Sequence, residues 1–215
     1  MRAIRSALVA VLIGSVVAGC GGGEVFYRAD PGDVERVPAT PRAIAAALLD
    51  HLEDEDVAAV GGVEELLPEA GPDGGRVLIA TARIADAELS VSVTPEDPAT
   101  TGAALCGELA EHCRDAVATD AAGDRTPYQV LWQPADRAGS DQGTAGMVLL
   151  RGESRVSVTL HGPEIPRGVE WTRLPVGRTV LESILLDPAI AAETLPELVD
   201  DGERIDGFVD RAFGL

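Results

Sequence analysis

Residues 89–94 read LSVSVT, a strict alternation of apolar and hydroxyl side chains. Successive side chains of a β-strand point to opposite faces of its sheet, so this pattern gathers the apolar residues on one face and the hydroxyls on the other. We therefore predict an antiparallel sheet with one buried and one water-facing side. The run over 77–84 is more uniformly apolar, and Asp86 is expected at a tight bend between these two strands.

Further strands are expected later in the chain, and the last two should form a hairpin that turns at Arg151-Gly152-Glu153-Ser154. The letters VSVT occur at both 91–94 and 156–159. Because the residues around the two copies differ, we attribute them to two half-buried strands and not to a duplicated unit. The later strands are predicted over Tyr128–Gln133, Ala145–Arg151 and Arg155–His161.

Helical spacing marks both ends of the folded region. Thr40 can cap a leading helix with Pro41 at its first position, and this helix is expected to fray near Glu53, where carboxylates oppose the helix dipole. Prolines and glycines over 61–75 allow only one short helical turn at 63–67. Short helices are also predicted over 179–186, within ETLPELVDDG at 193–202, and over 205–213. No long linker interrupts residues 40–215.

These elements predict one α+β domain over residues 40–215. It has a leading helix, an antiparallel sheet of four to six strands, and short C-terminal helices that cover one face. Residues 21–39, which contain glycines and prolines and lack apolar periodicity, are expected to form a flexible tether.

The charge of the chain excludes several functions. Its formal net charge is −19, and all 17 basic residues are arginine. So acidic a chain is unsuited to nucleic acid or to docking on an anionic lipid surface through a basic face. Without lysine there is no Schiff-base, P-loop or Ser-x-x-Lys chemistry. The sequence predicts no cofactor and no metal site.

The first twenty residues have the order of a secretory signal. Arg2 and Arg5 precede an apolar run over 7–17, and the small residues Ala18 and Gly19 follow. The run is shorter than the ~20 residues that a spanning helix needs. An ordinary signal peptide or a short membrane helix, with Cys20 incidental, is the alternative.

Val17-Ala18-Gly19-Cys20 resembles the lipobox of bacterial lipoproteins, and the acidic, lysine-free body is similar to lipoproteins of high-GC Gram-positive bacteria. The resemblance implies that Cys20 receives a diacylglyceryl group, with palmitate-type acyl chains, and that residues 1–19 are removed. Residues 20–39 would then be a lipid-anchored tether on the extracytoplasmic side of the cell membrane.

The other two cysteines, Cys106 and Cys113, form an even pair in a chain predicted to be exported, which favours a disulfide. A continuous helix through both would separate them by about 10.5 Å along its axis, whereas a disulfide needs Cα atoms within ~7 Å. Gly107 offers a break, so we predict the bridge. A metal site of Cys106, His112 and Cys113 would have spacing unlike that of structural zinc motifs.

No catalytic motif stands out in the sequence. The acidic stretch over 50–56 lacks the spacing of a calcium loop, and none of the three histidines belongs to a His-Glu-x-x-His motif. We therefore predict a non-catalytic lipoprotein that binds, scaffolds or senses an unknown envelope protein or small ligand. The alternative is a membrane-anchored hydrolase that uses His161 or His112 with a nearby carboxylate and serine.

Overall fold

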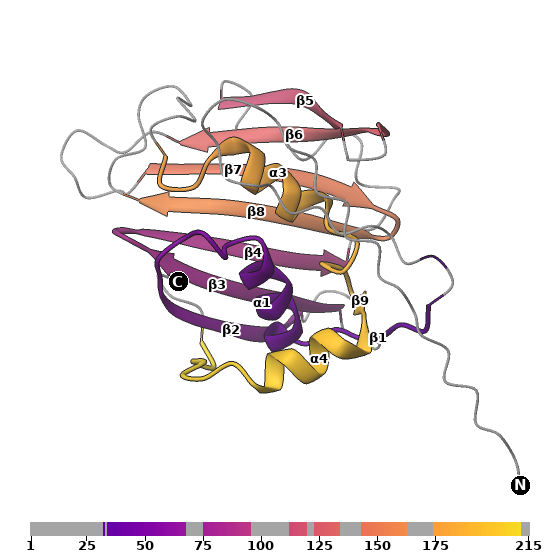
Figure 1. Ribbon diagram of the computed structural model, residues 1–215. Helices are drawn as coiled ribbons and strands as arrows, with labels where there is room; N and C mark the ends of the chain where they lie inside the picture. The colour runs from indigo at the N-terminus through magenta and orange to yellow at the C-terminus, as the bar shows by residue number, and fades with distance from the viewer. Residues whose placement is uncertain are drawn as a thin grey trace, which may run out of the picture.

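A computed structural model describes residues 32, 34–67, 75–95, 112–119, 123–133, 143–162 and 174–211. Three helices and nine strands are named within these ranges (Figure 1). In chain order they are β1 (Val37–Pro38), α1 (Pro41–Asp50), β2 (Val57–Leu67), β3 (Gly75–Ile84), β4 (Ala87–Pro95), β5 (Cys113–Thr119), β6 (Arg125–Gln133), β7 (Gly143–Arg151), β8 (Ser154–Gly162), α3 (Arg178–Leu186), β9 (Glu193–Thr194) and α4 (Pro196–Glu203).

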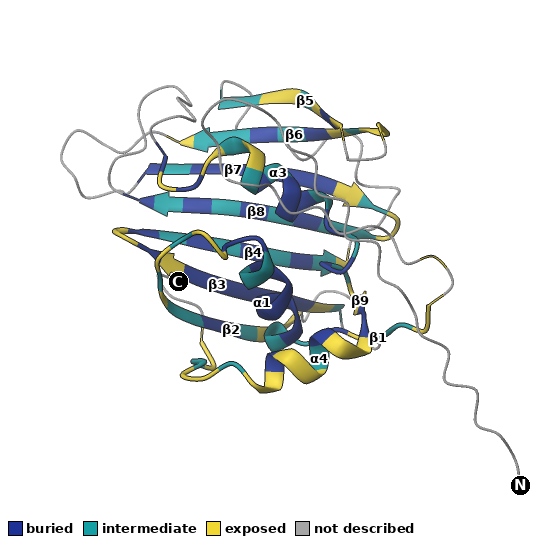
Figure 2. Cartoon of the chain, in the orientation of Figure 1, coloured by how far each residue is buried: buried dark blue, intermediate teal, exposed yellow. Residues whose placement is uncertain are grey.

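Seven of the strands form one antiparallel sheet in the order β2-β3-β4-β8-β7-β6-β5, and β1 pairs with β9 in a separate two-stranded sheet. The large sheet contains a three-strand meander, β2-β3-β4, and a four-strand meander, β5-β6-β7-β8, which meet where β4 pairs with β8. The two VSVT copies lie side by side at this junction, with Ser92 opposite Ser157. Their valines are buried and their hydroxyl residues half-buried, as the alternation predicts (Figure 2).

The expected fold class was wrong, because the structure is mostly β and its main sheet exceeds the four to six strands of the predicted α+β domain. The largest error is β2, which occupies the region expected to hold one short helical turn. Its glycines serve close packing: a Cβ on Gly62 would lie 2.5 Å from the Ile79 carbonyl oxygen and 3.0 Å from Pro41 Cβ. Glycine thus lets β2 run beneath the start of α1.

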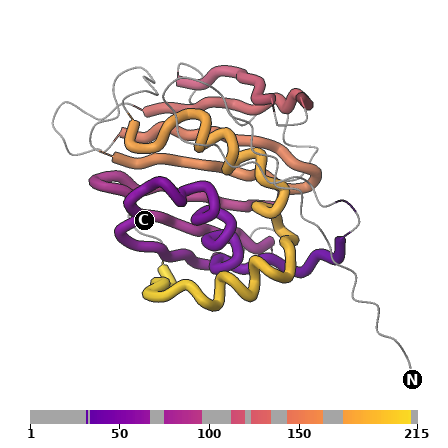
Figure 3. The backbone as a smooth tube through the Cα atoms, viewed as in Figure 1, coloured from indigo at the N-terminus to yellow at the C-terminus, as the bar shows by residue number. Residues whose placement is uncertain are grey.

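The helices α1 and α3 lie over the same side of the sheet, and α4 packs against α1 (Figures 1 and 3). The Thr40 hydroxyl caps α1 by accepting a hydrogen bond from the Ala43 amide at 3.1 Å. Ile44 and Leu48 of α1 and Ile184 of α3 are fully buried against the apolar face of the sheet. The hydroxyl-rich opposite face, which we call the outer face, carries none of the three described helices.

Both hairpin turns follow the sequence prediction. Arg151 pairs with Ser154 across the β7–β8 turn, where Gly152 has a φ of +58°. The β3–β4 turn contains Asp86 and places Ala85 at a φ of +51°. Local turn chemistry therefore sets the register of the central strands.

The two ends of the described chain differ from the predicted pattern. Val37 and Pro38, expected in the tether, pair with Thr194 and Glu193, and Ala39 is buried. No helix forms over the described part of 205–213; Val209 instead makes a parallel bridge with Gly61 of β2. The Gly62 amide donates to the Val209 carbonyl at 3.0 Å, and the Val209 amide donates to the Val60 carbonyl at 3.1 Å.

Candidate functional site

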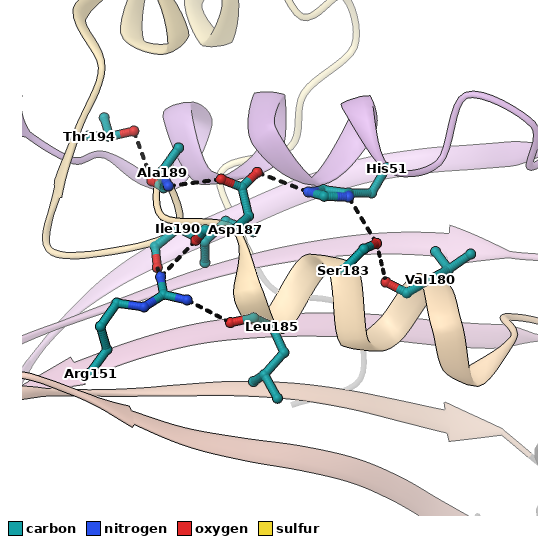
Figure 4. A network of polar contacts seen from close by, with 9 residues as sticks. All are labelled: His51, Arg151, Val180, Ser183, Leu185, Asp187, Ala189, Ile190 and Thr194. Atoms are coloured by element: carbon teal, nitrogen blue, oxygen red, sulfur yellow. Dashed lines mark hydrogen bonds and ion pairs between the residues drawn. The ribbon is translucent and has the colours of Figure 1, made fainter. Parts of the chain in front are cut away.

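A histidine, a carboxylate and a hydroxyl come together between α1 and α3 (Figure 4). His51 is the residue at which α1 ends, and its Nε2 lies 2.8 Å from Asp187 Oδ2. Its Nδ1 lies 3.0 Å from Ser183 Oγ. We call His51, Ser183 and Asp187 the buried network.

Helical spacing explains why α3 presents two members of the buried network to α1. Ser183 and Asp187 are four positions apart, so they lie on one side of α3, about one turn from each other. The Ser183 hydroxyl donates to the Val180 carbonyl at 2.8 Å. The second oxygen of Asp187 accepts a hydrogen bond from the Ala189 amide at 2.8 Å, which starts the turn after α3. Each Asp187 oxygen therefore has a partner.

Arg151, at the end of β7, binds the backbone on both sides of Asp187. Its guanidinium donates to the carbonyls of Leu185 at 2.8 Å, Asp187 at 2.7 Å and Ile190 at 3.1 Å. These carbonyls end α3 and begin the following turn, where the helix dipole favours a positive charge. Arg151 thus fixes the backbone on which Asp187 is carried.

The buried network has the atoms of a charge-relay site but not the access to solvent that catalysis requires. The side chains of His51 and Asp187 are 0% exposed, and Ser183 is 2% exposed. The arrangement therefore joins α1 to α3 and does not offer a nucleophile to a substrate.

The sequence carries a signal for part of this network. His51 continues the apolar side of the leading helix after Ile44 and Leu48, whereas Ser183 lies within the predicted helix over 179–186 and Asp187 directly follows it. Buried polar side chains need hydrogen-bond partners, and a histidine, a hydroxyl and a carboxylate can hydrogen-bond to one another.

The predicted candidate His161 lies elsewhere, on the outer face of the sheet. It stands opposite Glu88 of β4 and Thr144 of β7, and its Nδ1 lies 3.1 Å from Thr144 Oγ1. Arg83 of β3 extends the row because it is opposite Glu88. We call Arg83, Glu88, His161 and Thr144 the outer-face row.

Burial changes the acid–base properties of this row. Desolvation lowers the pKa of His161 and therefore favours the neutral imidazole. Desolvation also raises the pKa of Glu88, and the positive charge of Arg83 partly opposes that rise. Side chains opposite each other in neighbouring strands are close enough to interact, so the row can bind a polar group or exchange a proton with one.

The second histidine candidate, His112, contacts an aromatic ring. The His112 and Trp132 rings meet edge to face, with centroids 5.8 Å apart, and the Arg114 guanidinium lies 5.8 Å from the Trp132 ring centroid. The structure thus does not bring His112 and His161 into one site, since His112 precedes the edge strand β5 and His161 lies in the central β8.

Of the three predicted site cysteines, the structure describes only Cys113. Cys113 is disulfide-bonded at the start of β5. Cys106 lies outside the described residues, so the Cys106–Cys113 pairing stays a prediction. The predicted lipid attachment residue, Cys20, also lies outside them.

A second polar cluster joins β6 to α3. The Tyr128 hydroxyl donates to Glu182 Oε1 and accepts a hydrogen bond from Arg178 at 2.8 Å. Arg178 also binds Glu182 Oε1 through Nε at 2.9 Å. Desolvation, followed by the hydrogen bond to Glu182, raises the pKa of Tyr128 to about 12. Every member of the cluster has a partner of complementary chemistry, which is typical of a structural contact.

Two further features are absent from the described residues. No group of three or more His, Cys, Asp or Glu residues there is arranged to hold a metal ion. None of the described helices has the length and hydropathy required to cross a bilayer.

Comparison of the chain with protein-family models, curated proteins and solved structures finds no match. The function must therefore be argued from the residues themselves.

Proposed function

We propose that this chain is an exported lipoprotein, anchored through Cys20 to the outer face of the cytoplasmic membrane, with a non-catalytic domain that binds, scaffolds or senses. The order of features in residues 1–20 supports the anchor. One structural observation carries the non-catalytic part. The hydrogen-bonded trio of histidine, carboxylate and hydroxyl in the described residues is closed to solvent, with 0% exposure of the His51 and Asp187 side chains.

Charge explains why a lipid anchor would be needed. Loss of residues 1–19 removes Arg2 and Arg5 and lowers the formal charge of the body from −19 to −21. The outer side of α4 adds exposed carboxylates at Glu197, Asp201 and Glu203. An anionic bilayer would repel such a surface. A single acyl chain holds a protein only marginally, whereas two give stable anchoring.

The anchor is tested by expressing the full chain in a bacterium that makes lipoproteins and labelling it with an alkyne analogue of palmitate. We expect the label in the wild type and in Cys106→Ala, which also loses a cysteine, and no label in Cys20→Ala. Mass spectrometry should find a mature chain that begins at Cys20 with a diacylglyceryl group. A mature N-terminus elsewhere, or an unmodified Cys20, would refute the anchor.

The binding role is tested by cross-linking in intact membranes, followed by purification of the wild type and of Cys20→Ala. We expect envelope partners that the wild type captures and the unanchored variant loses. An identical partner set for both forms would argue against a role at the membrane.

A membrane-anchored hydrolase that uses His161 is the second candidate, favoured by the outer-face row, in which Glu88 and Thr144 flank His161. The test is hydrolysis of a panel of p-nitrophenyl esters by the wild type and by His161→Gln, with His112→Gln as the matched control. Activity lost only in His161→Gln would favour the enzyme. No hydrolysis by the wild type, or equal rates in all three proteins, would count against it.

A further inference from the structure

The N-terminal segment 34–39 is bound along its length by the connection between α3 and α4. Arg36 Nη1 donates to the Pro188 carbonyl at 3.0 Å and approaches the Glu193 carbonyl at 3.4 Å. β1 pairs with β9, and the Ala39 amide donates to the Ala192 carbonyl at 2.9 Å. Figure 1 shows β1 and β9 side by side, away from the main sheet. This contact joins the point where the tether enters the body to a segment about 150 positions later in the chain.

The same connection, residues 187–195, is folded by hydrogen bonds of its own. The Ala189 amide donates to Asp187 Oδ1, and the Thr194 hydroxyl donates to the Ala189 carbonyl, both at 2.8 Å. Asp187 and Thr194 are almost completely buried. The turn that presents the carbonyls for the N-terminal segment is therefore held by Asp187 and Thr194, together with Arg151, which binds the Asp187 and Ile190 carbonyls.

The carboxylate that folds the connection is also the one that binds His51 (Figure 4). Its two oxygens have different partners: Oδ2 faces the imidazole of His51, and Oδ1 accepts a hydrogen bond from the Ala189 amide. Pro188, whose carbonyl receives Arg36, is the next residue in the chain. A displacement of Asp187 thus reaches the Arg36 contact through a single peptide bond.

We propose that residues 187–195 form a clamp on the N-terminal segment 34–39, and that the His51–Asp187 contact keeps this clamp closed. When the clamp opens, β1 leaves β9, and Ala39 and Thr194 become exposed. Segment 34–39 contributes only Ala39 to the core, so the core beneath α1 and α3 stays intact as long as Ala189, Ile190 and Leu195 of the connection remain packed in it.

The consequence for the tether rests on the proposed anchoring at Cys20. With the clamp closed, Arg36 holds the N-terminal segment to the α3–α4 connection. With it open, the first fixed residue is Thr40, the cap of α1. The four added residues lengthen the tether by about 14 Å at full extension. They also move its point of attachment from the α3–α4 connection to the start of α1.

The test is amide hydrogen exchange at single-residue resolution on the full-length chain in detergent. Asp187→Ala removes both carboxylate contacts, so we expect the Ala39 amide to exchange about tenfold faster or more, relative to the Val91 amide at the centre of the sheet. Asp201→Ala removes an exposed carboxylate from α4 and should leave this ratio unchanged. If the Ala189 amide alone exchanges faster, or if Ala39 and Val91 accelerate equally, the clamp is refuted.

A milder variant keeps the test decisive if Asp187→Ala does not fold. Thr194→Val removes only the Thr194–Ala189 hydrogen bond and keeps a similar side-chain volume. We expect Thr194→Val to accelerate exchange at the Ala39 amide as Asp187→Ala does, but by a smaller factor. Exchange at the Val91 amide should stay unchanged. An unchanged Ala39 amide would overturn the proposal. Exchange does not depend on the acyl group, so this test and the labelling test at Cys20 can fail separately.

Discussion

The imidazole of His51 lies 2.8 Å from the carboxylate of Asp187, although 136 positions separate the two residues in the sequence. Both side chains are fully buried, and together with Ser183 they join the end of α1 to the end of α3. The two helices that cover the sheet are thereby fixed to each other by polar groups as well as by apolar packing.

Replacing His51 with alanine should lower the free energy of unfolding by about 3 kcal/mol, because it leaves a buried carboxylate without its partner. Urea denaturation measures the change. The exposed pair of Arg204 and Asp201 supplies the control, since Asp201→Ala should change stability by no more than about 0.5 kcal/mol. Similar small effects for both variants would show that the buried network contributes little.

Gly62→Ala should destabilise the protein by about 1–3 kcal/mol, because the new methyl group would lie 2.5 Å from the Ile79 carbonyl oxygen. Gly177→Ser is the contrasting variant. No atom lies within 4 Å of a Cβ at Gly177, and a serine there would give α3 the capping side chain that it lacks. Thermal unfolding should therefore show a lower Tm for the first variant and an equal or higher Tm for the second. An unchanged Tm for Gly62→Ala would contradict the close packing of β2 under α1.

The pKa of His161 gives the folding stability a definite pH dependence. Burial lowers this pKa below 6.5, so the unfolded chain binds a proton more readily than the folded one as the pH falls through 6.5. The stabilising effect of the neutral imidazole is therefore present above pH 6.5 and is lost as the pH falls toward the folded-state pKa. Urea denaturation should show this loss in the wild type and a weaker one in His161→Gln. NMR titration of His161 with a midpoint at or above 6.5 would contradict the prediction.

Tyr128 should titrate at a pH of about 12, well above the ordinary value of 10. The chain has two tyrosines, so an ultraviolet titration should resolve two phenol steps in the folded protein. Tyr128→Phe should abolish the later step and lower stability by about 1 kcal/mol through the lost hydrogen bonds with Glu182 and Arg178. If the later step survives this substitution, it belongs to Tyr27 and the polar cluster between β6 and α3 is wrongly described.

Local signals predicted the centre of the fold. The alternation in residues 89–94 depends only on neighbouring residues, and it gave the correct faces for β4. The turn at Arg151–Ser154 was equally local. Both predictions succeeded because strand period and hairpin chemistry do not require knowledge of distant parts of the chain.

The edges of the sheet could not be predicted in the same way. Gly61 and Gly62 look like strand breakers until Gly62 is known to lie against Pro41 at the start of α1. β5 has a mixed and largely exposed pattern that gives no clear period. Such strands are fixed by what pairs with them, and the pairing residues are distant in sequence.

The buried network was missed for a related reason. His51 lies on the apolar side of its helix, but only the folded structure shows that Ser183 and Asp187 both face it. Position in the sequence pointed to His112 and His161 as the candidates for chemistry. His51 lies in an acidic stretch, a pattern typical of a solvent-exposed helix end and not of a buried site.

The bridge between Gly61 and Val209 affects whether copies of this protein can associate through the edge of the sheet. An outermost strand with unsatisfied amides invites the strand of a neighbouring molecule to extend the sheet. By occupying the backbone groups of Val60 and Gly62, Val209 shields the middle of β2 from such pairing. If many copies are concentrated on one membrane, this shielding would help them remain separate molecules instead of seeding an aggregate.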